Sequence, residues 1–490
     1  MYVTTTIPYV NARPHLGFAL EIVQADVLAR HRRGRGEPVR FQTGTDDNSL
    51  KNVLAAEAEG VPVRELVDRN AAAFEALREP LELSFDAFVR TSRHPGHRAG
   101  VERIWKAVSH DLYRRSYEGL YCVGCEQFYP EGPCPEGHEA PLQRVAEENW
   151  FFRLSRYGDR LIDLVESGCL RVEPAARRNE VLAFLRGGLE DLSVSRSAAR
   201  ARGWGIPVPG DPDQVVYVWW DALANYVTAL EDDYDRWWVR EPRKIHLVGK
   251  GVIRFHAVYW PAMLLSAGLP LPSDIVVHDY LTAGGRKISK SSGVTVDPVA
   301  LVRAYGVDAV RWWLLREVPR VGDADFTEER LVARADEDLA NGVGNLVNRV
   351  VTMVHRFQDG HVTDREDRPG LAGEAERTLA EVEERTGALV DEALEDFDFR
   401  RAAAAVQEIV AAANAYVERV RPWQQEPADR EASLAALVAA CRTLAVRLEP
   451  FLPSAAARVA AAVGGERLPA PRPLFPRLAG SDVDRLPGRA

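Results

Sequence analysis

The chain has 490 residues, of which 46% are hydrophobic and 27% are charged, and its formal net charge is −10. This composition is typical of globular proteins and excludes a disordered or fibrous chain, while the length predicts two or three domains. The negative charge argues against a nonspecific nucleic-acid coat, although a local basic strip on an acidic protein can still bind RNA.

The opening segment "MYVTTTIPYV" is typical of a β-strand and not of a basic, apolar leader. A run of about 18 apolar residues, long enough to cross a membrane, does not occur in the sequence. We therefore expect a cytoplasmic protein with no membrane partner.

The order of the predicted elements indicates an α/β protein with a separate helical domain. Residues 1–115 alternate short strands with helices and form the first half of a Rossmann-like parallel sheet. Residues 116–210 change to short segments with a cysteine cluster and form an insertion, and 211–325 resume the sheet. Long Ala/Leu/Val periods over 326–463 predict a bundle of four or five helices. The Pro/Gly/Arg-rich end, 464–490, is expected to be a flexible tail.

Two segments carry candidate phosphate-binding residues. In "RPHLG", His15 at a strand-to-helix turn is placed to donate to a phosphate, and Gly17 leaves room for a nucleotide to approach the backbone. In "GGRKISKSSG", Lys287 and Lys290 are placed to clamp phosphates from a mobile loop. Each has a plain structural alternative, a capping histidine in the first segment and a basic surface loop in the second.

Four residues of the insertion have the spacing of a structural zinc site. Cys122, Cys125, Cys134 and His138 offer three thiolates and an imidazole, which suit a closed tetrahedral Zn²⁺. The alternative is a set of reduced, metal-free cysteines.

Taken together and in order, these segments resemble the methionyl-tRNA synthetases, a family of class I aminoacyl-tRNA synthetases. "PHLGF" stands where the family has His-x-Gly-His, and "KISKS" stands where it has Lys-Met-Ser-Lys-Ser. Other similar segments include "QTGTD", "GLYCVGCEQFY", "YVWWDALANYV", "FHAVYWPAML" and "NLVNRV". The resemblance extends from the first strand through the helical domain.

The resemblance implies ATP-dependent activation of L-methionine, with Mg²⁺, and its transfer to tRNA(Met) through methionyl-adenylate. Catalysis would rest on His15, Lys287 and Lys290, which position and stabilise charge without a protein nucleophile. The implied ATP-binding residues are Pro14, His15, Gly17, Phe18, Gly249, Gly251, Lys287, Ser289 and Lys290.

The resemblance also implies where methionine and the anticodon bind. Asp46 would hold the α-ammonium, and the thioether chain would lie among Ile7, Tyr9, Trp219, Leu223, Tyr226, Val252 and His256. Asn345, Arg349 and Trp423 would read the anticodon by edge recognition and stacking. Taken singly, the aromatic residues of the methionine set are equally typical of an ordinary core. The three anticodon residues, taken singly, are equally typical of a polar helix surface with a packing tryptophan.

Three residues depart from the family pattern, and we place all three at the nucleotide. Phe18 replaces the second histidine of the signature, Asn48 replaces the histidine of "GTDEHG", and Gly251 replaces the aspartate of "GKD". Phenylalanine cannot donate to developing phosphate charge, and losing one such donor costs about 2.7–4 kcal/mol.

The retained residues favour a divergent second methionyl-tRNA synthetase, altered around ATP and less sensitive to an inhibitor that exploits that region. Two alternatives stay open: a noncatalytic tRNA-binding paralogue, and an adenylating enzyme that acts on another small acid. Because the dimer-forming extension common in the family is not found, we expect a monomer.

Overall fold

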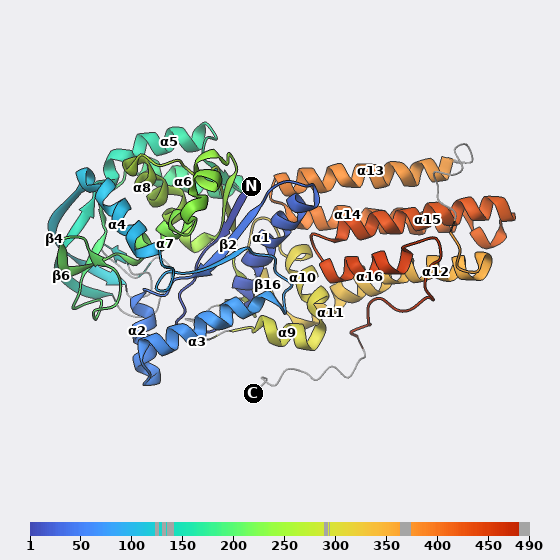
Figure 1. The fold of residues 1–490 in the computed structure, drawn as a ribbon, viewed down its shortest axis with the longest axis horizontal. Helices are drawn as coiled ribbons and strands as arrows, with labels where there is room; N and C mark the ends of the chain where they lie inside the picture. The colour runs from blue at the N-terminus through green and yellow to red at the C-terminus, as the bar shows by residue number, and fades with distance from the viewer. Residues whose placement is uncertain are drawn as a thin grey trace.

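The computed structural model describes residues 1–122, 127–129, 134, 142–288, 293, 295–362 and 374–479. An α/β lobe occupies one end of an elongated molecule, and long helices occupy the other end (Figure 1). None of the helices in these ranges is long and apolar enough to cross a membrane.

A six-stranded sheet with the order β3-β2-β1-β12-β13-β7 forms the centre of the α/β lobe. Every neighbouring pair in it is parallel, as predicted from the β/α alternation. The strands span Tyr2–Thr5 (β1), Arg40–Thr45 (β2), Ala87–Arg90 (β3), Arg171–Glu173 (β7), Lys244–Gly249 (β12) and Asp274–His278 (β13). The unbroken burial along β1, β2, β12 and β13 is typical of strands covered on both faces, although several of the buried residues of β1 and β2 are polar.

Helices cover both faces of this sheet and divide the apolar side chains into two clusters. One cluster joins the sheet to α1 (Leu16–Gly34), α3 (Val63–Glu75) and α10 (Val307–Arg316). The other joins it to α4 (His97–Ala107), α7 (Val218–Thr228) and α8 (Trp260–Ala267). Helix α2 (Leu50–Glu59) follows β2, with the Ser49 side chain capping its first turn.

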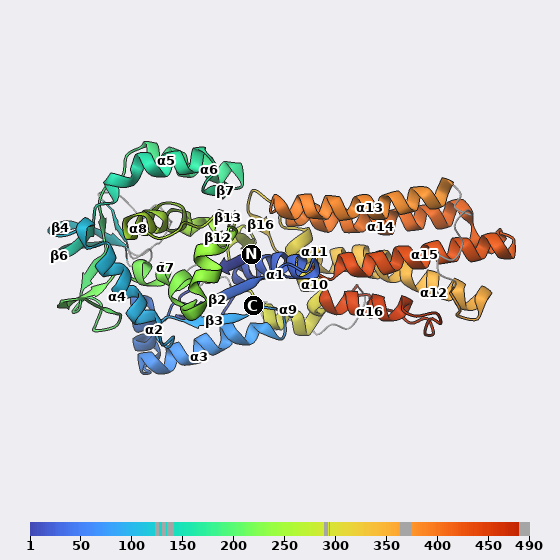
Figure 2. The same cartoon turned by 45° about the horizontal axis from the view of Figure 1, so that its top comes forward.

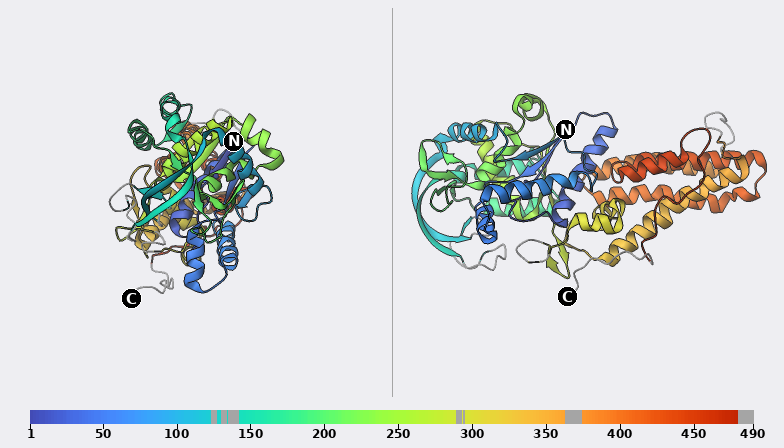
Figure 3. Two further views of the ribbon diagram at one scale, coloured as in Figure 1. Left: turned by 90° about the vertical axis from the view of Figure 1, so that its left-hand side faces the viewer. Right: turned by 60° about the horizontal axis from the view of Figure 1, so that its bottom comes forward.

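The range expected to form the insertion contains its own antiparallel sheet, with the order β5-β4-β6-β8. Its strands are β4 (Leu112–Cys122), β5 (Gln127–Tyr129), β6 (Gln143–Phe152) and β8 (Leu192–Ser193). The long β4–β6 pair lies at the end of the molecule opposite the helical bundle (Figures 1 and 3). A three-stranded sheet follows, from β9 (Ser195–Ser197), β10 (Pro207–Val208) and β11 (Asp211–Val216).

One strand of the same range belongs to the central sheet instead. Strand β7 pairs with β13 and is flanked by α5 (Gly158–Glu166) and α6 (Ala175–Arg186). The chain therefore returns to the parallel sheet between the strands of the insertion, and the domain boundaries stay a prediction.

A small sheet next to the central one carries the first part of the lysine loop. It has the order β15-β14-β16 and consists of β14 (Leu281–Ala283), β15 (Arg286–Lys287) and β16 (Ala324–Asp325). Helices α9 (Pro298–Tyr305) and α10 follow the loop, and the Asp297 side chain caps α9.

The helical bundle confirms the prediction of a helical region after the α/β lobe. Helix α11 (Glu328–Arg334) continues through a π-helical stretch (Ala335–Gly344) into α12 (Asn345–Gln358). The bundle continues with α13 (Glu374–Glu395), α14 (Phe399–Val420), α15 (Pro427–Leu448) and α16 (Pro453–Val463), which run alongside one another in Figure 2.

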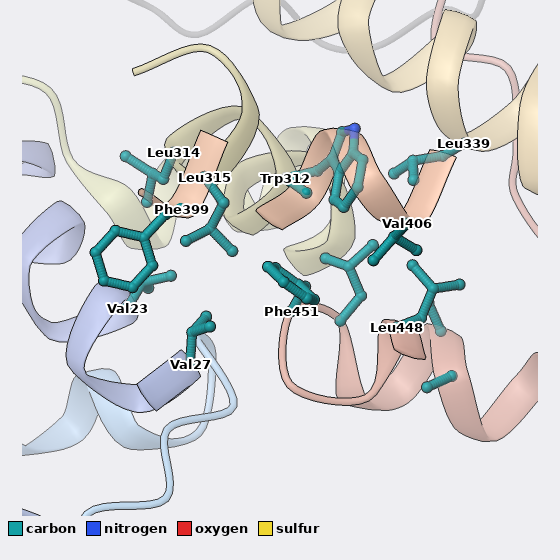
Figure 4. Packing of buried hydrophobic residues seen from close by; sticks show 14 of the residues in the cluster. Val23, Val27, Trp312, Leu314, Leu315, Leu339, Phe399, Val406, Leu448 and Phe451 are labelled. Carbon is teal, nitrogen blue, oxygen red and sulfur yellow. The ribbon is translucent and has the colours of Figure 1, made fainter. Parts of the chain in front are cut away.

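The bundle and the α/β lobe share one apolar core. Val23 and Val27 of α1 lie close to Leu314 and Leu315 of α10, and Phe399 of α14 packs into the same cluster (Figure 4). Side chains from α14, α15 and the turn after α15 continue this cluster into the bundle (Figure 4). The orientation of the bundle is therefore set by packing against α1 and α10 as well as by its own helices.

Candidate active site

A cavity of about 630 Å³ opens where β1, β12 and β13 end. This is the edge of a parallel sheet at which ligands are expected, outside the carboxyl ends of the strands. Residues of the predicted ATP-binding and methionine-binding sets both line it: His15, Gly17, Phe18, Gly249, Gly251 and Lys287 from the first, and Ile7, Tyr9, Trp219 and Val252 from the second.

His15 is the residue before the first turn of α1, and its ring is oriented by the backbone. The Nδ1 atom of His15 accepts a hydrogen bond from the Gly17 N–H at 3.1 Å. In the neutral ring the proton therefore sits on Nε2, which makes Nε2 a donor. A Cβ atom at Gly17 would lie only 3.0 Å from the His15 ring, so a larger residue there would displace the imidazole.

Phe18 contributes both to the cavity wall and to the core. Its side chain is only 7% exposed and packs edge-to-face on Phe74 of α3, with ring centroids 5.0 Å apart. The phenyl ring therefore packs the start of α1 against α3. It stands where the family signature has a histidine, which could donate a hydrogen bond.

Glu21 and His278 form a partly buried pair in the cavity that sequence reasoning missed. Nδ1 of His278 lies 2.8 Å from the Asp279 carbonyl, so it donates there, and Nε2 lies 2.9 Å from Oε2 of Glu21. The Nε2–Oε2 contact holds one proton between imidazole and carboxylate. Oε1 of Glu21 accepts from the Thr6 N–H. The position of His278 at the last residue of β13 is the signal that could have identified it.

Tyr280 lies between two lysines at the mouth of the cavity. Nζ of Lys287 is 3.4 Å from the centroid of the Tyr280 ring, and Nζ of Lys250 is 4.5 Å from it. Lys250 is neutralised by Asp323 at 2.6 Å, and the Tyr280 N–H donates to the same carboxylate. The aromatic face thus holds the Lys287 ammonium at the cavity. Ser289 and Lys290 lie outside the described residues.

The other predicted methionine-binding residues are buried. Leu223, Tyr226 and His256 are each exposed by 2% or less, and Trp219 stacks on Phe255 with ring centroids 3.9 Å apart. Pro14 is buried at the turn that leads into α1.

Tyr226 and His256 form a hydrogen-bonded pair whose proton positions follow from the contacts. Nδ1 of His256 donates to the Val252 carbonyl at 2.9 Å, so Nε2 accepts from the Tyr226 hydroxyl at 2.8 Å. Burial lowers the pKa of His256 to about 4, which keeps the imidazole neutral near pH 7.

Asp46 and Asn48 occupy the loop between β2 and α2. Asp46 is 1% exposed, and its backbone N–H donates to the Pro8 carbonyl beside Tyr9. The structure places Asn48 away from the described cavity lining, because its amide donates to the buried Asp221 carboxylate of α7 at 2.7 Å. Of the three departures from the family pattern, Phe18 and Gly251 line the cavity and Asn48 does not.

The predicted anticodon residues lie on the helical bundle. Arg349 of α12 bonds Glu418 at 2.7 Å, and its guanidinium carbon lies 5.6 Å from the Trp423 ring centroid. Trp423, between α14 and α15, is 40% exposed, and Asn345 is an exposed residue one helical turn before Arg349. An aromatic ring and a guanidinium are thus available side by side to solvent.

Two family models together cover most of the chain. The model described as "tRNA synthetases class I (M)" matches residues 1–145 and 139–351, and "Anticodon binding domain of methionyl tRNA ligase" matches 368–478. The chain belongs to the methionyl-tRNA synthetase family.

Full-length relatives and solved structures agree with this family. The methionine–tRNA ligase of Brucella suis is 38% identical over 98% of both chains, and that of Mycobacterium tuberculosis is 39% identical over 97% of both. A structure of Mycobacterium tuberculosis methionyl-tRNA synthetase in complex with methionyl-adenylate superimposes with a TM-score of 0.89 at 37% identity, covering 97% of this chain and 99% of that one.

The predicted zinc site of this methionyl-tRNA synthetase family member is only half described. Cys125 and His138, two of its four predicted ligands, lie outside the described residues. Cys122 at the end of β4 and Cys134 are both buried. Within the described ranges, three or more His, Cys, Asp or Glu side chains do not gather in a group that could hold a metal ion. The zinc site therefore stays a prediction.

Proposed function

We propose that this chain is a methionine–tRNA ligase, which activates L-methionine with ATP and transfers it to tRNA(Met). The observation that carries the proposal is that residues from both the nucleotide set and the methionine set line one cavity. A shared cavity is required because the methionine carboxylate must reach the α-phosphate in line.

In the first step a carboxylate oxygen of methionine forms a bond to the α-phosphorus of ATP. The bond between the α-phosphorus and its bridging oxygen to the β-phosphate breaks, and pyrophosphate leaves. In the second step the terminal ribose hydroxyl of tRNA attacks the activated carbonyl, and AMP leaves with the bonding electron pair. Neither step needs a covalent bond to the protein.

The side chains at the cavity supply positioning and charge stabilisation. The Nε2–H of His15 donates to phosphate oxygens at the start of α1, where backbone N–H groups and the helix dipole also favour negative charge. Lys287 and Lys290 neutralise the leaving pyrophosphate, with Lys287 oriented by the Tyr280 ring. Mg²⁺ bound to the ATP phosphates would add further charge neutralisation.

The methionine side chain is assigned to the wall formed by Ile7, Tyr9, Trp219 and Val252, with the buried Leu223, Tyr226 and His256 behind it. A neutral His256 suits a thioether, since a buried imidazolium would disfavour an uncharged ligand. The Asp46 carboxylate is assigned to the α-ammonium group.

Two further assignments concern metal and tRNA. Cys122 and Cys134, as buried thiols, fit ligands of a structural Zn²⁺ completed by Cys125 and His138, and the ion would cross-link the insertion. Arg349 and Trp423, with Asn345, fit the recognition of unstacked anticodon bases. A cytoplasmic monomer is proposed as the working form.

The test is amino-acid-dependent exchange of pyrophosphate into ATP over a panel of amino acids, followed by charging of tRNA(Met). Exchange with methionine and subsequent charging is expected. Exchange with another acid would favour the adenylating alternative, and tight tRNA binding without exchange would favour the noncatalytic paralogue. The altered nucleotide wall at Phe18 and Gly251 supports the divergent second copy; equal inhibition of this enzyme and an ordinary family member by an ATP-site inhibitor would contradict it.

A further inference from the structure

Asn48 contacts two parts of the amino-acid site at once. Its backbone N–H donates to Oδ1 of Asp46 at 3.0 Å, and its side-chain amide donates to Oδ2 of Asp221 at 2.7 Å. One residue therefore joins the carboxylate assigned to the methionine ammonium to a carboxylate on α7.

Asp221 is a fixed anchor for this contact. Its side chain is 1% exposed, and its second oxygen, Oδ1, lies 2.5 Å from Nε2 of His97 at the start of α4. The other ring nitrogen of His97 lies 2.6 Å from the Thr228 hydroxyl, and His97 is wholly buried. A buried carboxylate with two donors has little freedom to move, because each lost donor leaves charge unsatisfied in an apolar surrounding.

Helix α7 also carries the residues assigned to the methionine side chain. Trp219, Leu223 and Tyr226 lie on the same helix, on either side of Asp221 in the sequence. Through Asn48, the loop that binds the ammonium group is fastened to the helix that forms the thioether pocket. Strand β2 is also joined to α7 by the Gln42 amide, which donates to Oδ1 of Asn225 at 3.0 Å, but the Asn48 bond is made within the loop that carries Asp46.

We propose that Asn48 is a positioning residue for the amino acid, which holds Asp46 in register with the methionine pocket by anchoring its loop to Asp221. The inference rests on the proposed function and assigns Asn48 to the methionine side of the reaction instead of the nucleotide side. Asn48 acts through Asp46 and Asp221 and does not itself touch the substrates.

The test measures methionine-dependent pyrophosphate exchange in the full-length chain with Asn48→Ala. We expect KM for methionine to rise roughly ten-fold or more, the scale of one lost hydrogen bond to a charged group, while KM for ATP changes less than about two-fold. The control is Asn70→Ala, because the Asn70 amide, like that of Asn48, donates one hydrogen bond from a packed position: it donates to the Val10 carbonyl at 2.7 Å, and Asn70 is 3% exposed. The control should leave both constants close to wild type.

Two further variants keep the test decisive. Asn48→Asp has the same shape as the wild-type side chain but places a second carboxylate against Asp221, so it should also raise KM for methionine. This variant replaces Asn48→Ala if the alanine variant does not fold. Asn48→His supplies a side-chain donor that Asn48→Ala lacks, so its KM for methionine should lie closer to the wild-type value than that of the alanine variant.

The outcomes separate the two proposals. If the wild-type chain shows no exchange with methionine, the proposed function fails before Asn48 is tested. If wild-type exchange occurs and Asn48→Ala changes neither Michaelis constant, or both equally, the positioning role is overturned.

Discussion

Asp26 of α1 and Arg311 of α10 form an ion pair with an Nη2–Oδ2 distance of 2.9 Å, and both side chains are wholly buried. Arg311 also donates to the carbonyls of Leu81, Pro450 and Phe451. The pair therefore joins α1, the helix that His15 caps, to the turn between α15 and α16 of the bundle.

Breaking this pair should destabilise the whole chain, because a buried charge loses its partner. Asp26→Asn keeps the shape of the side chain and is expected to lower the free energy of unfolding by about 3–5 kcal/mol. Chemical denaturation measures the change. The control is Glu102→Gln in the exposed Arg98–Glu102 pair, where the expected loss is no more than about 0.5 kcal/mol. Similar losses in the two variants would contradict a structural role for the buried pair.

Stability should fall in mild acid because of His256. Burial lowers its pKa from 6.5 to about 4, so the unfolded chain binds the proton more readily than the folded chain between these values. The contribution of the neutral His256 to the free energy of unfolding is therefore complete above pH 6.5. As the pH falls towards 4, the free energy of unfolding decreases by roughly 3 kcal/mol.

Unfolding followed from pH 7 to pH 4 checks this dependence. His256→Gln should reduce the slope, and a remaining slope is expected from His246, whose pKa burial also lowers. His110→Gln is the control because the His110 side chain is 61% exposed. An unchanged slope in His256→Gln would show that other groups carry the acid sensitivity.

Phe18→His tests whether the phenylalanine weakens the nucleotide site. A histidine would return a donor to the cavity wall and is expected to raise kcat for adenylation roughly ten-fold or more. Its loss of the edge-to-face contact with Phe74 should cost about 1 kcal/mol of stability.

The matched variant is Phe74→Leu, which removes the same aromatic contact from the other side and adds no donor. It should lower stability without raising kcat. A Phe18→His enzyme that is no faster than wild type would indicate a cavity rebuilt around the phenyl ring.

Trp423→Ala should impair charging of tRNA but not adenylation. Stacking on an aromatic side chain contributes about 1–3 kcal/mol per base, so kcat/KM for tRNA(Met) is expected to fall roughly ten-fold to a hundred-fold. Pyrophosphate exchange without tRNA should stay at the wild-type rate. Val446→Ser, at another exposed apolar position of the bundle, is the control, with 68% exposure. An equal effect of both variants on charging would contradict a specific role for Trp423.

Much of this protein could be predicted from local patterns. The alternation of strands and helices predicts the parallel sheet, because a strand covered on both faces is apolar along its length and its crossover helix has a period of 3.6 residues. His15 could be placed at a helix start because the turn residues precede the apolar period. The orientation of the His15 ring is set by the backbone N–H of Gly17, two residues later, which donates to Nδ1.

Tertiary structure decided what lies opposite each of these residues. Asn48 could be assigned to the nucleotide by its motif, but its partner Asp221 lies 173 positions away and lies on the methionine helix. The pairing of Glu21 with His278, and of Asp26 with Arg311, likewise depends on which helix packs against which strand. Periodicity reports which face of an element is buried but not what it is buried against. The sequence alone therefore determined the elements and the family, and packing decided which side chains share a proton, a charge or a substrate.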